Sequence, residues 1–177
     1  MKIMIIGQSG AGKSTLARSL QATTGSPLLA LDRLWLATDY GKAAKQWLLK
    51  EQEKFMAENK DWIIEGNYLS IAKDRIEQAD LILMLRLPRY RAMYRVVKRS
   101  LKRKLDKSTR PDVPEEFIEK FDKEYLDFLL FVWRFKKERE PLAIKKIYEH
   151  GAEGKLVILN GPRQQKKFLE QWRSRSS

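Results

Sequence analysis

The sequence contains no cysteine and only one histidine, His150. Without cysteine the chain cannot form disulfide bonds, and metal or redox chemistry based on thiols is excluded. A chain without cysteine suits a reducing compartment, so we expect a cytoplasmic protein. His150 stands directly before Gly151, and we interpret it as a residue that caps the end of a helix.

Long apolar segments are also missing. The longest apolar run extends from Tyr125 to Phe135 and is interrupted by Asp127 and Arg134. It is shorter than the ~18 residues that a membrane-spanning helix needs. The N-terminal apolar run is too short for a signal peptide and leads directly into a glycine-rich loop. We therefore expect no membrane partner, and we interpret the run at 125–135 as a core contact or as the contact of a homodimer.

Acidic residues are scarce relative to basic ones. The chain has 36 Lys and Arg against 23 Asp and Glu, which gives a formal net charge of +13. Such a charge attracts nucleic acid, membrane surfaces and nucleotide phosphates alike. Because no known DNA-reading motif is present, we expect the charge to serve phosphate chemistry and solubility, and we do not expect specific nucleic-acid binding. The alternative is a nucleic-acid-associated protein that uses ATP as a switch, with basic stretches at 98–104, 134–139 and 163–175.

Short apolar strands alternate with helices along the chain. The pattern predicts strands at 1–6, 28–32, 62–67, 81–85 and 155–160, and helices at 13–22, 43–59, 70–78, 86–105, 112–138, 141–148 and from 162 onwards. In the helix at 43–59 we expect Trp47, Leu48, Phe55 and Met56 to be buried. This alternation predicts an α/β fold with a parallel sheet between two layers of helices. Residues 101–150 look entirely helical. We interpret them as a helical lid or side bundle inserted into one domain that covers residues 1–177.

The most specific motif is the stretch "GQSGAGKSTLA" behind the first predicted strand. It matches the phosphate-binding loop G-x-x-x-x-G-K-[ST], with an apolar strand before it and an amphipathic helix after it. In such a loop the backbone N–H groups point at phosphate oxygens, Lys13 reaches the β and γ phosphates, and the Ser14 hydroxyl binds Mg²⁺. The predicted ATP-binding residues are Gly7, Ser9, Gly10, Ala11, Gly12, Lys13, Ser14, Thr15 and, after the last strand, Pro162.

The loop "ILNGPR" around Pro162 follows the last predicted strand, near the phosphate-binding loop. A purine base can rest at such a place. The equally favoured alternative is a plain strand-to-helix turn with Pro162 in the first helical position.

Two carboxylates, Asp32 and Glu65, lie at the ends of predicted strands. In an open parallel sheet, ligands bind beyond this edge. Each carboxylate can orient Mg²⁺-bound water or accept a proton from an attacking hydroxyl. The alternative is that each is a helix cap or a turn residue.

A row of arginines follows the fourth predicted strand. Arg91, Arg95 and Arg99 recur at i, i+4 and i+8, and arginines that close over a transferring phosphoryl group stabilise its charge. Arg110 stands in a polar loop that can close over the same site. The alternative is a solvated basic helix face, which we favour for Arg89, Lys102, Arg103 and Lys104.

Several segments in this order resemble the bacterial topology modulation proteins, which are adenylate-kinase-like P-loop proteins; the segments are "GQSGAGKST", "ALDRLW", "DWIIEGNY", "ADLILMLRLPR", "RVVKRSLKR", "TRPD" and "VWRFKKER". "IIEGNY" resembles the "DGFPR"-type segment of nucleoside monophosphate kinases, with Glu65 and Gly66 on its Asp-Gly positions. Tyr68 and Leu69 stand where those kinases carry Pro-Arg. Arg95 and Arg99 resemble their paired lid arginines. The resemblance implies a five-stranded sheet in the order 2-3-1-4-5 and a helical lid.

We therefore expect an ATP-dependent, Mg²⁺-requiring small-molecule kinase of the nucleoside-monophosphate-kinase-like class, whose acceptor the sequence does not name. If the sheet has the implied order, Glu65 neighbours the phosphate-loop strand and suits Mg²⁺, together with Ser14. Asp32 then suits the acceptor and its hydroxyl proton. A protein that binds ATP without transferring phosphate is a further alternative. The predicted acceptor-binding residues are Asp32, Arg33, Glu65, Gly66, Asn67 and Tyr68, and the predicted catalytic residues are Lys13, Asp32, Arg95 and Arg99.

Overall fold

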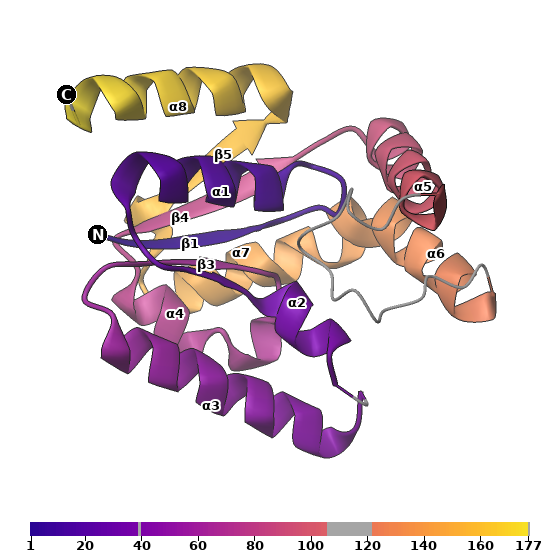
Figure 1. The fold of residues 1–177 in the computed structure, drawn as a ribbon, viewed down its shortest axis with the longest axis horizontal. Coiled ribbons are helices and arrows are strands. Elements are labelled where there is room, and N and C mark those ends of the chain that lie inside the picture. Colours follow the sequence, from indigo (N-terminus) through magenta and orange to yellow (C-terminus); the bar gives the residue numbers. More distant parts are fainter. Residues whose placement is uncertain (39, 106–121, 177) are drawn as a thin grey trace.

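The fold is built on one parallel sheet. The computed structural model describes residues 1–38, 40–105 and 122–176 (Figure 1). Its five strands lie in the order β2-β3-β1-β4-β5, and every neighbouring pair is parallel. This confirms the predicted sheet and the strand order that the resemblance implied. The strands are β1 (Lys2–Gly7), β2 (Leu28–Ala30), β3 (Trp62–Glu65), β4 (Leu81–Arg86) and β5 (Leu156–Asn160).

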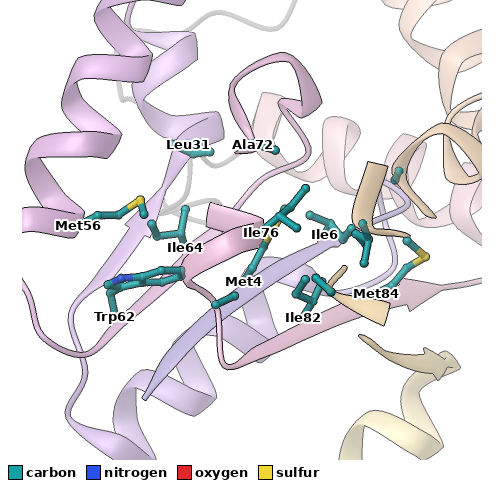
Figure 2. Packing of buried hydrophobic residues seen from close by; sticks show 14 of the residues in the cluster. Met4, Ile6, Leu31, Met56, Trp62, Ile64, Ala72, Ile76, Ile82 and Met84 are labelled. Atoms are coloured by element: carbon teal, nitrogen blue, oxygen red, sulfur yellow. The ribbon is translucent and has the colours of Figure 1, made fainter. Parts of the chain in front are cut away.

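Helices cover both faces of the sheet, because alternate strand residues point to opposite sides. In β1, Ile3 and Ile5 enter one buried cluster, whereas Met4 and Ile6 enter the other. The first cluster packs under α1 (Lys13–Thr24), α5 (Arg89–Leu105), α6 (Lys123–Glu138) and α8 (Gly161–Ser176). The second, shown in Figure 2, packs under α2 (Leu31–Leu36), α3 (Lys42–Glu58), α4 (Lys73–Gln78) and α7 (Glu140–Glu149). The predicted three-layer architecture is thus confirmed.

Two local predictions are wrong. The second strand ends at Ala30, so Asp32 lies in the first turn of α2 and not at a strand end. A carboxylate in this turn is stabilised by the positive end of the helix dipole. In α3 the buried stripe runs through Leu48, Gln52 and Met56, whereas Trp47 is 39% exposed. Consecutive residues lie about 100° apart around a helix. Trp47, the neighbour of Leu48, therefore lies outside the buried stripe.

The predicted helical insertion has two different parts. The predicted start of a helix at Asp112 lies outside the described residues, and α6 begins after Asp122, whose side chain accepts a hydrogen bond from the Tyr125 backbone N–H. The next helix, α7, places Ala143 and Ile147 in the core beneath the sheet. His150 caps the end of α7, as predicted. That the range 101–150 forms a lid stays a prediction.

The carboxyl ends of the strands bring the motif residues together. Gly7 at the end of β1 lies opposite Leu85 of β4, and Ile5 lies opposite Glu65 of β3. Figure 1 shows α5 and α6 at this same end of the sheet, beyond the loop between β1 and α1. No helix among the described residues combines the length and hydropathy of a membrane-spanning segment.

Candidate active site

The phosphate-binding loop is packed against neighbouring backbone. Gly7, Gly10 and Gly12 have φ angles of 128°, 80° and 100°, which side chains other than glycine rarely adopt. A Cβ atom on Gly7 would lie 2.2 Å from the Leu85 carbonyl oxygen, and one on Gly10 would lie 2.8 Å from the Ala92 carbonyl oxygen. The loop therefore needs glycine both for its turn and for its contact with β4 and α5.

Only part of the loop backbone is used by the protein itself. The Gly7 N–H donates to Asn67 Oδ1, the Gln8 N–H to the Leu85 carbonyl and the Ala11 N–H to the Gln8 carbonyl. In the described part of the chain, the remaining loop amides have no partner; they belong to Ser9, Gly10, Gly12, Lys13 and Ser14. These N–H groups lie at the N-terminal end of α1, which is the arrangement that binds phosphate.

Lys13, Ser14 and Glu65 converge beside the loop. The Lys13 Nζ atom lies 3.9 Å from Glu65 Oε1, and the Ser14 hydroxyl donates to Glu65 Oε2 at 3.4 Å. Glu65 is 1% exposed and Lys13 is 7% exposed. Buried Glu65 thus contacts two consecutive residues of the phosphate-binding loop, Lys13 and Ser14, although it lies about 50 residues further along the chain.

Arg75 is a buried residue of this region that the sequence analysis missed. It is fully buried, and its guanidinium donates to the carbonyl groups of Gly66 and Tyr68 at 3.0 and 3.3 Å. Burial lowers the pKa of Arg75, and the charges of Glu65 and Tyr68 oppose that shift. A signal was present: Arg75 lies three residues after Ala72 and four before Ala79, and therefore within the apolar stripe of its helix.

We predict that Arg75→Met will lower the free energy of unfolding by about 1–3 kcal/mol, because it leaves the carbonyl groups of Gly66 and Tyr68 without their donor. Thermal and urea unfolding measure the effect. Arg163→Met, which changes an exposed arginine of α8, is the matched control and should change stability little. If the two variants have the same free energy of unfolding, the contacts of Arg75 make no net contribution to stability.

The segment after Glu65 lies between the phosphate loop and α2. Both ends of the Asn67 side-chain amide bind the backbone of Gly7, at 2.9 and 3.0 Å. Burial, together with the nearby carboxylates of Asp32 and Glu65, raises the pKa of the Tyr68 hydroxyl far above its usual range. Arg33 is exposed. The structure thus brings Asp32 and Tyr68 together, and it shows that the Asn67 amide binds the loop.

The arginines of α5 do not share one line along the helix. Their spacing of four residues exceeds the 3.6 residues of one helical turn, so each arginine is shifted around the helix from the one before. Arg91 is exposed, Arg95 donates to the Gly10 carbonyl at 3.4 Å, and Arg99 is half-buried. Arg103 is 3% exposed, so the prediction that it lies on a solvated face is wrong. Arg110 lies outside the described residues.

Two glutamines that the sequence analysis did not single out also hold the loop. Gln8 is 2% exposed, and its Nε2 atom donates to the Val132 carbonyl of α6 at 3.2 Å. Gln165 of α8 donates to the Ala11 carbonyl at 2.9 Å. Neither residue belongs to the fixed positions of the motif, and no local pattern distinguishes them from ordinary polar residues.

A cavity of about 320 Å³ lies between α1 and α8, and most of its lining is apolar. Thr15 and Pro162 stand in its wall with Leu16, Gln165 and Leu169. Two predicted ATP-binding residues, Thr15 of the motif and Pro162 after β5, therefore line the same cavity. That a purine base binds here stays a prediction.

Comparison with known proteins identifies the fold. No protein-family model matches the chain, and no curated protein is significantly similar to it. Among solved structures, a shikimate kinase from Bacteroides thetaiotaomicron superposes with a TM-score of 0.59 at 19% identity, covering 97% of this chain and 96% of that one. A gluconokinase from Sinorhizobium meliloti 1021 superposes with a TM-score of 0.54 at 13% identity, covering 98% and 94%.

A shikimate kinase from Acinetobacter baumannii, in complex with shikimate, superposes with a TM-score of 0.50 at 19% identity and covers 98% of this chain and 93% of its own. The chain has a P-loop kinase fold. At this level of identity the likeness concerns the arrangement of strands and helices. In the P-loop kinase fold of this chain, Lys13, Ser14 and Glu65 lie at the carboxyl edge of the sheet.

Proposed function

We propose that the protein is an ATP-dependent kinase that transfers the γ-phosphoryl group of ATP to a hydroxyl of a small molecule. The convergence of Lys13, Ser14 and Glu65 beside a loop with unpaired amides carries this proposal. Lys13 and the loop amides hold the phosphates of ATP. The base occupies the cavity between Thr15 and Pro162.

Mg²⁺ fits this site through Ser14 and Glu65. The Ser14 hydroxyl and the Glu65 carboxylate already lie 3.4 Å apart. No group of three or more His, Cys, Asp or Glu side chains gathers among the described residues, which suits an ion held by one carboxylate, a hydroxyl and substrate phosphates. When bound, the ion neutralises the charge on the β and γ oxygens.

On the acceptor side, Asp32 takes the proton of the attacking hydroxyl. The acceptor oxygen forms a bond to the γ-phosphorus, and the bond from that phosphorus to the β–γ bridging oxygen breaks, leaving ADP. Arg95, beside Gly10, and Arg99 stabilise the charge that spreads over the transferring group. Arg110 is proposed for the same task. Arg33, Gly66, Asn67 and Tyr68 border the acceptor.

We further propose, from the resemblance of the motifs, that the kinase is of the nucleoside-monophosphate-kinase-like type found in topology modulation proteins. This type concerns the phosphate loop and the paired arginines and leaves the acceptor open, because Tyr68 and Leu69 replace the Pro-Arg of those kinases. A helical lid at 101–150, a cytoplasmic location and a homodimer through the helical block belong to the same proposal. The exposed side chains of Leu126, Leu130 and Trp133 on α6 supply an apolar face for such a contact.

A phosphate-transfer screen tests the proposed function. The purified chain is incubated with ATP and Mg²⁺ and with nucleosides, nucleotides and small hydroxyl compounds, and ADP release is measured with and without each acceptor. Acceptor-dependent ADP release with a phosphorylated product supports a kinase. ATP binding with no transfer to any compound would favour a nucleotide-binding switch instead.

A second function, a nucleic-acid-associated ATP switch, is favoured by one observation. The helix α5 contains no acidic residue, and it exposes Tyr90 and Tyr94 to 62% and 65% among its arginines and lysines. Basic residues attract the phosphate backbone, and exposed rings offer surfaces on which bases stack.

We predict that this surface gives only weak, non-specific binding of duplex DNA. We expect a dissociation constant above ~10⁻⁶ M at physiological salt, as is typical of non-specific binding. Fluorescence anisotropy with a labelled duplex at several salt concentrations measures it. Tighter binding that weakens steeply as salt rises would favour the switch over the kinase.

A further inference from the structure

Three aromatic rings form a row on the acceptor side of the site. The Trp35 ring centroid lies 5.7 Å from that of Tyr40 and 5.8 Å from that of Tyr68. Tyr40 is 50% exposed, and the other two rings are partly exposed. The row begins at the turn after Glu65, where the Tyr68 ring lies against Gly66, and it ends at the surface. A molecule bound beside Asp32 therefore meets flat apolar faces.

Carboxylates stand along the same row. Asp32 lies one helical turn before Trp35 in α2, and both Asp32 and Glu65 lie close enough to the Tyr68 hydroxyl to raise its pKa. At the other end, burial of the Tyr40 ring raises its pKa, and Glu124 in the first turn of α6 raises it further. The charges that act on these hydroxyl groups are thus negative.

The buried cations described here are already engaged by the protein. Arg75 binds the carbonyls of the segment at 66–68 and balances Glu65. Lys13 pairs with Glu65 and faces the phosphate loop. Asp32 lies beside the Tyr68 hydroxyl, whereas Arg33, the next residue, is exposed. A carboxylate at this place attracts hydroxyl groups and repels anions.

We propose that the acceptor is an uncharged hydroxyl compound with a flat apolar face, one that carries neither a phosphate nor a carboxylate. Its hydroxyls donate to Asp32, and its flat face lies on the Trp35 ring with Tyr40 at the rim. A sugar with its C–H face on the ring and a nucleoside with its base on the ring share this chemistry. The inference rests on the proposed kinase function and names the substrate class of that site.

Matched acceptor pairs test the inference. Each pair contains an uncharged compound and its anionic counterpart: cytidine with cytidine 5′-monophosphate, adenosine with adenosine 5′-monophosphate, and glucose with gluconate. Initial rates of ADP formation give kcat/KM for each acceptor at saturating ATP and Mg²⁺. In any pair that accepts phosphate, we expect kcat/KM to be at least tenfold higher for the uncharged compound. The preferred compound then shows whether the acceptor is a nucleoside or a sugar.

Two ring variants test the assigned surface. Trp35→Ala should lower kcat/KM for the preferred acceptor at least tenfold while the dissociation constant of ATP stays within twofold. Trp47→Ala removes an exposed tryptophan of α3 and should leave both quantities unchanged. Because Trp35 also contacts the core, Tyr40→Ala is the second variant, with Tyr148→Ala, another exposed tyrosine, as its control. We expect at least a threefold loss for Tyr40→Ala alone.

The outcomes separate the two proposals. Equal kcat/KM for both members of a pair, or a preference for the anionic member, would overturn the acceptor class and leave the kinase standing. Retention of full acceptor kcat/KM in both Trp35→Ala and Tyr40→Ala would also overturn it. Transfer to neither member of any pair, in a protein that binds ATP, would count against the kinase itself.

Discussion

The Lys13→Ala variant should fold and should lose 10²–10³-fold or more in phosphoryl transfer, on the order of the loss seen when one stabilising donor of a developing charge is removed. In the parent protein the Lys13 Nζ atom is buried beside Glu65, at the N-terminal end of α1. In the proposed complex this cation reaches the β and γ phosphates, and no other described side chain of the loop carries a positive charge. Titration with ATP and steady-state turnover measure the two losses.

A control is needed because Lys13 also neutralises part of the charge of buried Glu65. Thermal unfolding establishes whether the variant is folded, and Lys145→Ala, which removes an exposed lysine of α7, gives the effect of losing a charge elsewhere. A folded Lys13→Ala protein with the ATP affinity and turnover of the parent would refute the role of the loop in catalysis.

The second large effect concerns the two carboxylates. Asp32→Asn should leave binding of ATP and Mg²⁺ nearly normal and reduce transfer by ~10²–10⁴-fold, the usual contribution of a positioned general base. Glu65→Gln should instead raise the Mg²⁺ concentration needed for half activity, because Glu65 and not Asp32 contacts Ser14. Nucleotide binding titrated with Mg²⁺, and turnover with the preferred acceptor, distinguish the two variants.

The reverse pattern would exchange the two roles. If Asp32→Asn loses its response to metal and Glu65→Gln loses only turnover, then Asp32 is the metal ligand. If neither variant differs from the parent in either titration, both residues are structural, and the kinase loses the acceptor side of its mechanism. Tyr68→Phe is a useful companion, since it removes the hydroxyl beside Asp32 but keeps the ring.

The fold could be predicted from the sequence because its signals are local. Apolar strands, glycine-ended helices and the phosphate loop each depend on a few neighbouring residues, and strand order followed from the resemblance of motifs. Local reasoning failed for Asp32, where an apolar stretch continued from a strand into a helix, and for Trp47, which lies beside the buried stripe of its helix and not in it.

The site was only partly predictable, because several of its contacts join distant segments. Lys13, Ser14 and Glu65 were identified as separate motif residues, and the structure adds that they touch. The roles of Arg75 and Gln8 depend on backbone carbonyl groups of other segments. Every residue has such a group, so the sequence does not show which of them will accept a hydrogen bond. Arg103 was assigned to solvent because basic helix faces usually are solvated, but the surroundings of α5 bury it.

The double hydrogen bond between Asn67 and Gly7 has a thermodynamic consequence. It joins the segment at 66–68, which we propose to border the acceptor, to Gly7, the first residue of the loop that we propose to bind ATP. Neither segment can shift without straining two hydrogen bonds to the other, so a ligand that orders one of them lowers the entropy cost of ordering the second. Such coupling is reciprocal. If the bound acceptor raises the affinity for ATP by a certain factor, bound ATP must raise the affinity for the acceptor by the same factor.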